Sequence, residues 1–150
     1  MKTADTIGMI LKSKAVNKIL SIAPEQSVYD ALGLMAEFDI GALLVVSDNR
    51  LVGILSERDY ARKVILLGHG SKETKVHQIM TSPVHFVHPE QTVDECMALM
   101  TQHHFRHLPV LKEETIVGLV SIGDLVKWVI SGQEKTIQDL EGYISGVYPG

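Results

Sequence analysis

Residues 53–60 read Gly-Ile-Leu-Ser-Glu-Arg-Asp-Tyr, and residues 118–125, which lie 65 positions further on, read Gly-Leu-Val-Ser-Ile-Gly-Asp-Leu. Both stretches run from a glycine through two apolar residues into Ser-x-x-Asp. Around them, residues 22–64 align with residues 87–129 without a gap, and thirteen of these 43 positions are identical. Repetition over such a length indicates a duplicated structural unit. The chain is therefore predicted to fold as two copies of one unit.

Each copy carries the same succession of local signals. A capping box opens it, Ser27…Asp30 in the first copy and Thr92…Glu95 in the second. Apolar residues then recur at i, i+3, i+4 and i+7, which predicts an amphipathic helix. Two short apolar runs separated by a polar turn predict a pair of strands, and a second helix begins at each Ser-x-x-Asp. With a short strand before each Pro-Glu-Gln, the expected unit is β-α-β-β-α, which gives an α/β (α+β) fold class.

The repeat also sets the expected domain boundaries. We predict a first unit over residues 6–66, a linker over 67–75 and a second unit over 76–131. A C-terminal helix and tail are expected over 132–150, with the helix from about 136 to 145 because apolar residues there share one face.

Composition narrows the class of protein. The 150 residues are 45% apolar and 21% charged, as in a globular chain. The net charge of −4 argues against nucleic-acid binding, which needs a basic face. No stretch has the length of a transmembrane helix or the pattern of a signal peptide, so we expect a cytoplasmic protein without a membrane partner. The single cysteine, Cys96, lies in an apolar helical pattern and is predicted to be buried.

The Ser-x-x-Asp pairs, Ser56…Asp59 and Ser121…Asp124, have two interpretations that do not exclude each other. Each pair can be a helix cap, since an acid in the first turn also suits the helix dipole. Each can also hold a ligand, because the motif ends a strand, its glycine allows close approach to the backbone, and a helix start favours phosphate. The aspartate could then accept both hydroxyl groups of a ribose.

The duplicated unit, the Gly-x-x-Ser-x-x-Asp pairs and the Arg106-His107-Leu108-Pro109-Val110 run resemble a tandem pair of cystathionine-β-synthase (CBS) domains, called a Bateman module. The resemblance covers the chain from about Thr6 to Ile130. It implies two pseudo-symmetric units packed through their sheets, with clefts that bind AMP, ADP, ATP, NAD or S-adenosylmethionine. It also implies a free-standing regulatory module that forms a homodimer and signals to an unidentified partner protein.

The resemblance further implies which residues contact the ligand. The serine and aspartate of each motif are expected at ribose and phosphate, and the apolar residue two positions before each serine at the base. Residues that lead into the next strand are expected at phosphate, and residues of the short first strands at the base pocket. The expected set is Leu20, Gly41, Ile54, Ser56, Arg58, Asp59, Val84, His85, Arg106, His107, Leu119, Ser121 and Asp124.

The two copies differ in charge next to the motif. Arg58 precedes Asp59, whereas a glycine precedes Asp124. Pairing across the halves would bring Arg58 and the Arg106-His107 pair toward one cleft. We therefore hypothesise that the clefts are inequivalent and that the Asp59 cleft holds the phosphate-bearing ligand.

Metal binding, catalysis and assembly are the alternatives to ligand sensing. His103-His104-x-x-His107 and His85-x-x-His88 have the spacing of metal ligands, but a helix end expected between His104 and Arg106 would separate the first set. We therefore expect no metal. The sequence contains no Gly-x-Ser-x-Gly elbow and no Walker-type loop, so no enzyme activity is expected. The alternative to a ligand sensor is a structural assembly domain with empty clefts. The aspartate present in both motifs favours the sensor.

Overall fold

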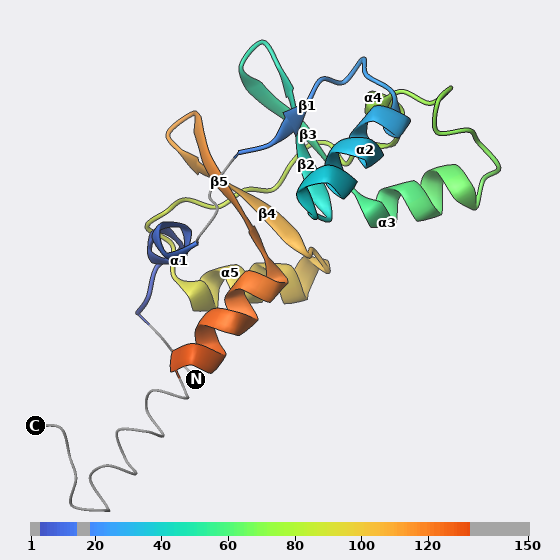
Figure 1. Ribbon diagram of the computed structural model, residues 1–150. Helices are drawn as coiled ribbons and strands as arrows, with labels where there is room; N and C mark the ends of the chain where they lie inside the picture. The colour runs from blue at the N-terminus through green and yellow to red at the C-terminus, as the bar shows by residue number, and fades with distance from the viewer. Residues whose placement is uncertain (1–3, 15–18, 133–150) are drawn as a thin grey trace, which may run out of the picture. The chain divides into compact units, whose positions relative to one another are not determined.

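The computed structural model describes residues 4–14 and 19–132, and these residues form two compact units (Figure 1). Unit 1 contains residues 4–14, 88–108 and 119–132. Unit 2 contains residues 19–87 and 109–118. The N-terminal segment thus belongs with the second sequence repeat. The division by repeat stays a prediction, and the expected helix at about 136–145 lies outside the described residues.

Unit 2 is built around a three-stranded sheet in the order β1-β2-β3. β1 pairs with β2 in parallel, and β2 pairs with β3 in the antiparallel sense. The first repeat supplies β1 (Ser21–Ile22), α2 (Val28–Phe38), β2 (Ala42–Ser47), β3 (Arg50–Ser56), α3 (Glu57–Tyr60), the π-helical segment η1 (Ala61–Ile65) and, after the linker, α4 (Val76–Ile79).

Helix α2 lies along this sheet because its apolar stripe needs a partner surface (Figure 1). Ala31 and Met35 of α2 join Leu43, Val45 and Leu55 of the strands in one buried core. Ser27 caps the start of α2 by accepting the backbone N–H of Asp30 at 3.0 Å, which is the serine half of the predicted capping box; the return bond from the Asp30 carboxylate is not formed. Most of the stabilisation of the unit comes from this burial.

The turn between β2 and β3 has residues suited to its backbone. Asp48 and Asn49 have φ angles of 51° and 62°. Consecutive left-handed residues make the tight turn that matches strand twist, and Asp and Asn tolerate that conformation better than other residues with a side chain. The register set by this turn shifts once, between Val45 and Val46, before β3 ends with Ser56 opposite Ala42.

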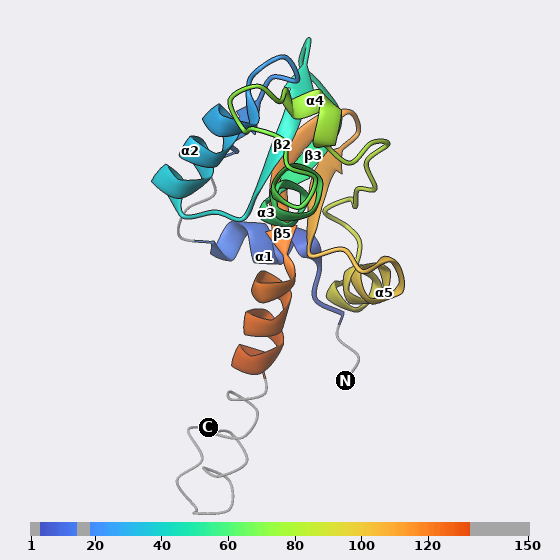
Figure 2. The ribbon, with the colours of Figure 1, turned by 90° about the vertical axis from the view of Figure 1, so that its right-hand side faces the viewer.

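Gly53, the motif glycine, allows a close approach, but the approaching group is a side chain of the same unit. A Cβ atom at this position would lie 2.9 Å from Cγ of Met80 and closer still to its sulfur. Met80 follows α4, which lies beside β3 (Figure 2). Thr81 then pairs with Ile54 through two backbone hydrogen bonds of 3.1 and 2.9 Å. At Gly53, therefore, the absence of a side chain makes room for Met80.

Unit 1 contains α1 (Ile7–Ser13), α5 (Val93–His103) and a helix over residues 122–132. The N-terminal segment is tied to the start of α5: Ile7 N donates to Gln91 O at 2.9 Å, and Val93 N donates to Asp5 O at 2.9 Å. Thr92 and Glu95 form the expected capping box. Cys96 is fully buried on α5, as predicted.

The strands of the second repeat are β4 (His107–Lys112) and β5 (Thr115–Ser121), which form a two-stranded sheet. Val87 pairs with Val110 in parallel, in the position that β1 has in the first repeat. Helix α5 ends at His103, and His104 takes a left-handed conformation with a φ of 59°. The α+β class and the β-α-β-β-α order predicted for each repeat are confirmed.

Candidate ligand-binding site

The first Ser-x-x-Asp pair is a complete capping box at the end of β3. Ser56 Oγ accepts the backbone N–H of Asp59 at 3.2 Å. In return Asp59 Oδ2 accepts the backbone N–H of Ser56 at 2.9 Å and its hydroxyl at 3.1 Å. The helix-cap interpretation is therefore confirmed, and the cap holds the carboxylate in one orientation.

The second pair repeats this geometry at the end of β5. Ser121 Oγ accepts the N–H of Asp124 at 3.1 Å, and Asp124 Oδ2 accepts the N–H of Ser121 at 2.8 Å. The side chains of Asp59 and Asp124 are 15% and 25% exposed. Each carboxylate is thus partly desolvated but still open to an incoming group.

A lysine neutralises the first carboxylate. Lys63 Nζ lies 3.1 Å from Asp59 Oδ1, one helical turn further along the chain. The same ammonium group donates to the carbonyl oxygen of Ile79 at 2.9 Å. Lys63 therefore links the motif to α4.

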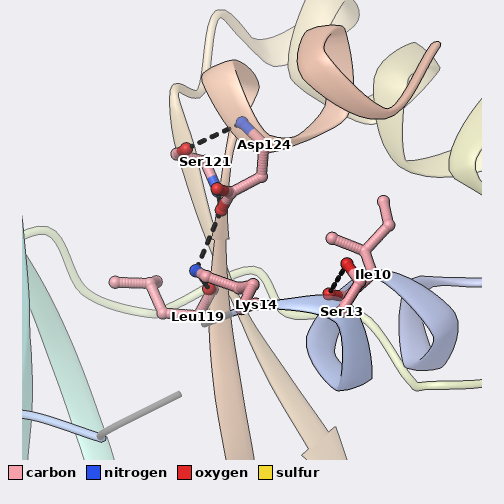
Figure 3. A network of polar contacts seen from close by, with 6 residues as sticks. All are labelled: Ile10, Ser13, Lys14, Leu119, Ser121 and Asp124. Atoms are coloured by element: carbon pink, nitrogen blue, oxygen red, sulfur yellow. Dashed lines mark hydrogen bonds and ion pairs between the residues drawn. The ribbon is translucent and has the colours of Figure 1, made fainter. Parts of the chain in front are cut away.

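A different lysine neutralises the second carboxylate. Lys14 Nζ lies 3.0 Å from Asp124 Oδ2 and donates to the carbonyl oxygen of Leu119 at 3.1 Å (Figure 3). Lys14 is the C-cap residue of α1. The residue before it, Ser13, donates its hydroxyl to Ile10 O at 2.7 Å. The repeat alignment puts Trp128, not a lysine, opposite Lys63. The two units thus reach one arrangement, aspartate, lysine and backbone carbonyl, from non-equivalent positions.

The residues that lead into the central strands contact the motif helices through their backbones. Gly41 O accepts the N–H of Glu57 at 3.1 Å, and Arg106 O accepts the N–H of Ile122 at 2.9 Å. Together with the serine caps, these bonds occupy two of the first three amides of each helix. Fewer backbone donors are left for an anion than the sequence pattern suggested.

His107 lies in the electrostatic environment of the second motif. Burial lowers the pKa of His107 below its ordinary value; Asp124 opposes this change, and Lys14 and Arg106 reinforce it. The imidazole is therefore neutral at neutral pH. Asp124, Lys14 and Arg106 thus all lie near enough to this imidazole to affect its protonation.

The remaining expected site residues fall into separate units. The structure places Leu20, Gly41, Ile54, Ser56, Arg58, Asp59, Val84 and His85 in unit 2, and Arg106, His107, Leu119, Ser121 and Asp124 in unit 1. Leu20 packs on the core of unit 2, and Ile54 pairs with Thr81. The expected pairing of Arg58 with the Arg106-His107 pair across the halves stays a prediction.

Two residues of the site were missed by sequence reasoning. Lys63 follows Asp59 by four positions, a spacing that brings side chains together on a helix and could have been recognised. Lys14 is 110 positions from Asp124, and no local pattern connects them.

Within residues 4–14 and 19–132, no three His, Cys, Asp or Glu side chains are grouped so that they could hold a metal ion. In the same residues no helix is long and apolar enough to cross a membrane.

The CBS-domain family model matches residues 12–65 and 76–131, which are the two repeats with their motifs. The chain belongs to the CBS-domain family. Tandem CBS modules are generally regulatory and often bind adenosine ligands.

Similar proteins share this organisation. The chain is 42% identical over 151 residues to the mitochondrial CBS domain-containing protein CBSX3 of Arabidopsis thaliana, covering 95% of this chain and 73% of the relative. A CBS-domain protein of Burkholderia ambifaria MC40-6 is 54% identical with a TM-score of 0.83, covering 85% and 96% of the two chains. A hexameric CBS-CP12 protein from bloom-forming cyanobacteria is 28% identical with a TM-score of 0.74, covering 84% and 72%. The cytoplasmic location stays a prediction.

Proposed function

We propose that this CBS-domain chain is a regulatory module that binds an adenosine-containing ligand at its Ser-x-x-Asp turns. The ligand is AMP, ATP, NAD or S-adenosylmethionine, and binding signals to a partner protein by a conformational change. One observation carries the proposal: both units hold a backbone-fixed aspartate against a lysine, and the two lysines come from non-equivalent positions.

Helix capping alone does not account for this arrangement. The capping box explains why a serine and an aspartate stand three positions apart. It gives no reason for an ammonium group 3.0 or 3.1 Å from each carboxylate that is also held by a backbone carbonyl. A fixed carboxylate can accept the two hydroxyl groups of a ribose in charge-assisted hydrogen bonds, and a nearby ammonium can bind phosphate. The pair therefore matches the two polar parts of a nucleotide.

Signalling requires that the ligand bind one conformation of the module more tightly than another. A ribose that binds Asp59 or Asp124 competes with the lysine paired to that carboxylate. Lys63 also holds α4 through the carbonyl oxygen of Ile79, and Lys14 is itself the last residue of the α1 segment. Ligand binding can thereby change how firmly these segments are held. The proposal includes no catalytic step by this chain.

Calorimetric titration of purified, ligand-free protein with AMP, ATP, NAD and S-adenosylmethionine tests the proposal. Asp59→Ala and Asp124→Ala each remove one carboxylate, and Asp30→Ala is the matched control because Asp30 also stands three residues after a capping serine. Binding that is lost in a motif variant and kept in Asp30→Ala supports the proposal. Absence of heat with all ligands, from folded protein, contradicts it.

The inequivalence of the two sites needs its own comparison. We propose that the Asp59 site holds the phosphate-bearing ligand, since Arg58 stands beside it. Arg58→Ala is then expected to weaken nucleotide binding more than Asp124→Ala does. If Asp124→Ala abolishes binding and Arg58→Ala leaves the affinity unchanged, the roles of the sites are reversed.

A second candidate function, assembly, is favoured by one surface feature. Ile122, Val126 and Ile130 recur every four residues on one face of the helix over 122–132, and they are 43%, 42% and 47% exposed. An exposed apolar stripe of this kind is typical of a protein–protein interface. We propose that the chain forms a homodimer through it, while the CBS-CP12 neighbour forms a hexamer. Val126→Glu is expected to convert dimer to monomer in sedimentation experiments; an unchanged mass would exclude this face.

A further inference from the structure

Lys14 reaches Asp124 from a distant part of the chain and occupies the carboxylate that a ligand would need. Its ammonium group lies 3.0 Å from Asp124 Oδ2, the oxygen that also accepts the N–H of Ser121 (Figure 3). The two side chains are 27% and 25% exposed, so water can reach the pair only in part. A ligand that hydrogen-bonds to Asp124 must therefore compete with an ion pair that is weakly screened.

Lys14 and Asp124 share their surroundings with His107 and a second cation, Arg106. Arg106 and Lys14 both act on His107, which is kept neutral by its burial, and Asp124 is the carboxylate acting on the same imidazole. A ligand without negative charge would take Asp124 from Lys14 and leave the lysine ammonium group without its counter-ion. A ligand with a phosphate would return a counter-ion to Lys14 when it takes Asp124.

We propose that Lys14 makes the Asp124 site select adenosine ligands that carry a phosphate over an uncharged nucleoside and over the sulfonium cation S-adenosylmethionine. The inference rests on the proposed function and narrows the ligand class of that same site. It assigns a second, weaker-binding phosphate-bearing ligand to the Asp124 site, besides the one proposed for the Asp59 site. Lys14 is a specificity-determining residue here, because its charge decides which ligands exchange favourably with the existing ion pair.

The lysine is expected to act on the two ligand classes in opposite directions. Adenosine has to break the Lys14–Asp124 pair and offers nothing in exchange, so removal of the lysine should leave its affinity unchanged or raise it. AMP gains a charge-assisted hydrogen bond from the lysine, and such a bond corresponds to roughly a tenfold change in affinity or more. A lysine with only a structural role would weaken both ligands together when removed.

Titrations of AMP, adenosine and S-adenosylmethionine into Asp59→Ala protein test the inference, since this background reports on the Asp124 site. Trp128, the single tryptophan, lies four residues after Asp124 and gives a fluorescence signal besides heat. We expect AMP to bind about tenfold tighter than adenosine or more. In Lys14→Met this ratio should fall about tenfold, and in Lys14→Arg, which keeps the charge, it should persist. Lys12→Met, an exposed lysine of α1, is the matched control and should change nothing.

The outcomes separate the inference from the proposed function. No binding of any adenosine ligand to the unmodified protein overturns both. Binding to the unmodified protein with none in the Asp59→Ala background overturns this inference alone, because the Asp124 site then takes no nucleotide. An AMP-to-adenosine ratio that is the same in Lys14→Met as in its parent also overturns it. Should Lys14→Met lose its fold by circular dichroism, Lys14→Gln and the Lys14→Arg comparison provide the test.

Discussion

The indole N–H of Trp128 donates a 2.8 Å hydrogen bond to a carboxylate oxygen of Asp5, which lies 123 positions earlier in the chain. The bond fastens the N-terminal segment to the helix that begins after Ser121. In the first repeat Lys63 occupies the position of Trp128 and contacts its own aspartate. The aspartate of the second motif, Asp124, is instead paired with Lys14, which belongs to the N-terminal segment that Trp128 helps to hold.

Removing the acceptor should loosen this attachment. Asp5→Ala is expected to lower the free energy of unfolding by about 1.5–3 kcal/mol, the usual contribution of a hydrogen bond to a charged group. Trp128 should become more exposed and its fluorescence should shift to longer wavelength. Asp5→Asn keeps an oxygen acceptor, so its free energy of unfolding should fall much less. Equal losses in both variants, measured by urea unfolding, would show that the hydrogen bond is not what stabilises this contact.

Two glycines should respond to alanine in opposite directions. Gly53→Ala brings a methyl group against Met80, and overpacking of this kind costs about 1–3 kcal/mol. Gly33→Ala on α2 has nothing within 4 Å of the new Cβ and should stabilise by about 0.5–1 kcal/mol through better helix propensity. The urea midpoints of the two variants, compared with that of the unmodified protein, measure both effects. A stabilised Gly53→Ala would mean that the Met80 side chain can adopt another rotamer that avoids the new methyl group.

His107 should make unit 1 sensitive to acid. Because burial lowers the pKa of His107 in the folded state, the unfolded chain binds a proton first as the pH falls below the ordinary value of 6.5. The free energy of unfolding therefore decreases as the pH falls from 6.5 toward the folded pKa and levels off below it. His107→Gln should flatten the profile between pH 7 and 5. The same substitution at exposed His69 should leave the profile unchanged; a profile unaltered by His107→Gln would refute the assignment.

Cys96 should be unreactive in the native protein. Burial raises the pKa of its thiol from 9.0 to about 11, so very little thiolate exists at pH 8. A thiol reagent should modify it about a hundredfold or more slowly in the folded state than in urea, since each pKa unit changes the thiolate fraction tenfold. Ala98→Cys, exposed on the same helix, should add one rapidly reacting thiol. Rapid modification of Cys96 itself would indicate that α5 opens readily.

The helices and strands of the fold could be predicted because their sequence signals are local and occur in both repeats. Ser27, Thr92 and both motif serines cap helices within three residues, and Asp48 and Asn49 adopt the left-handed backbone of a tight turn. The capping role of the Ser-x-x-Asp motif could be predicted for the same reason, since its two residues are only three positions apart. Such features depend on residues close in sequence, so a pattern can reveal them.

The contacts that complete the site depend on tertiary structure and could not be predicted in that way. Lys14 has no lysine counterpart in the repeat, and its partner is 110 positions away. Gly53 illustrates the same limit, since a glycine indicates that something approaches closely without indicating what. The sequence pattern suggested a ligand, and the structure places Met80 there.

The membership of residues 4–14 in unit 1 also has a consequence during synthesis of the chain. Ile7, Ile10 and Leu11 of α1 are buried in the finished protein, while Asp5 and Lys14 bind residues made more than a hundred codons later. The segment therefore leaves the ribosome with an apolar face whose partners in unit 1, residues 88–108 and 119–132, are made much later. Contacts of such long sequence separation form slowly, and incomplete chains that expose apolar surface aggregate readily. A chain interrupted before His88 would present this face permanently, which makes α1 the segment that a chaperone would be expected to bind.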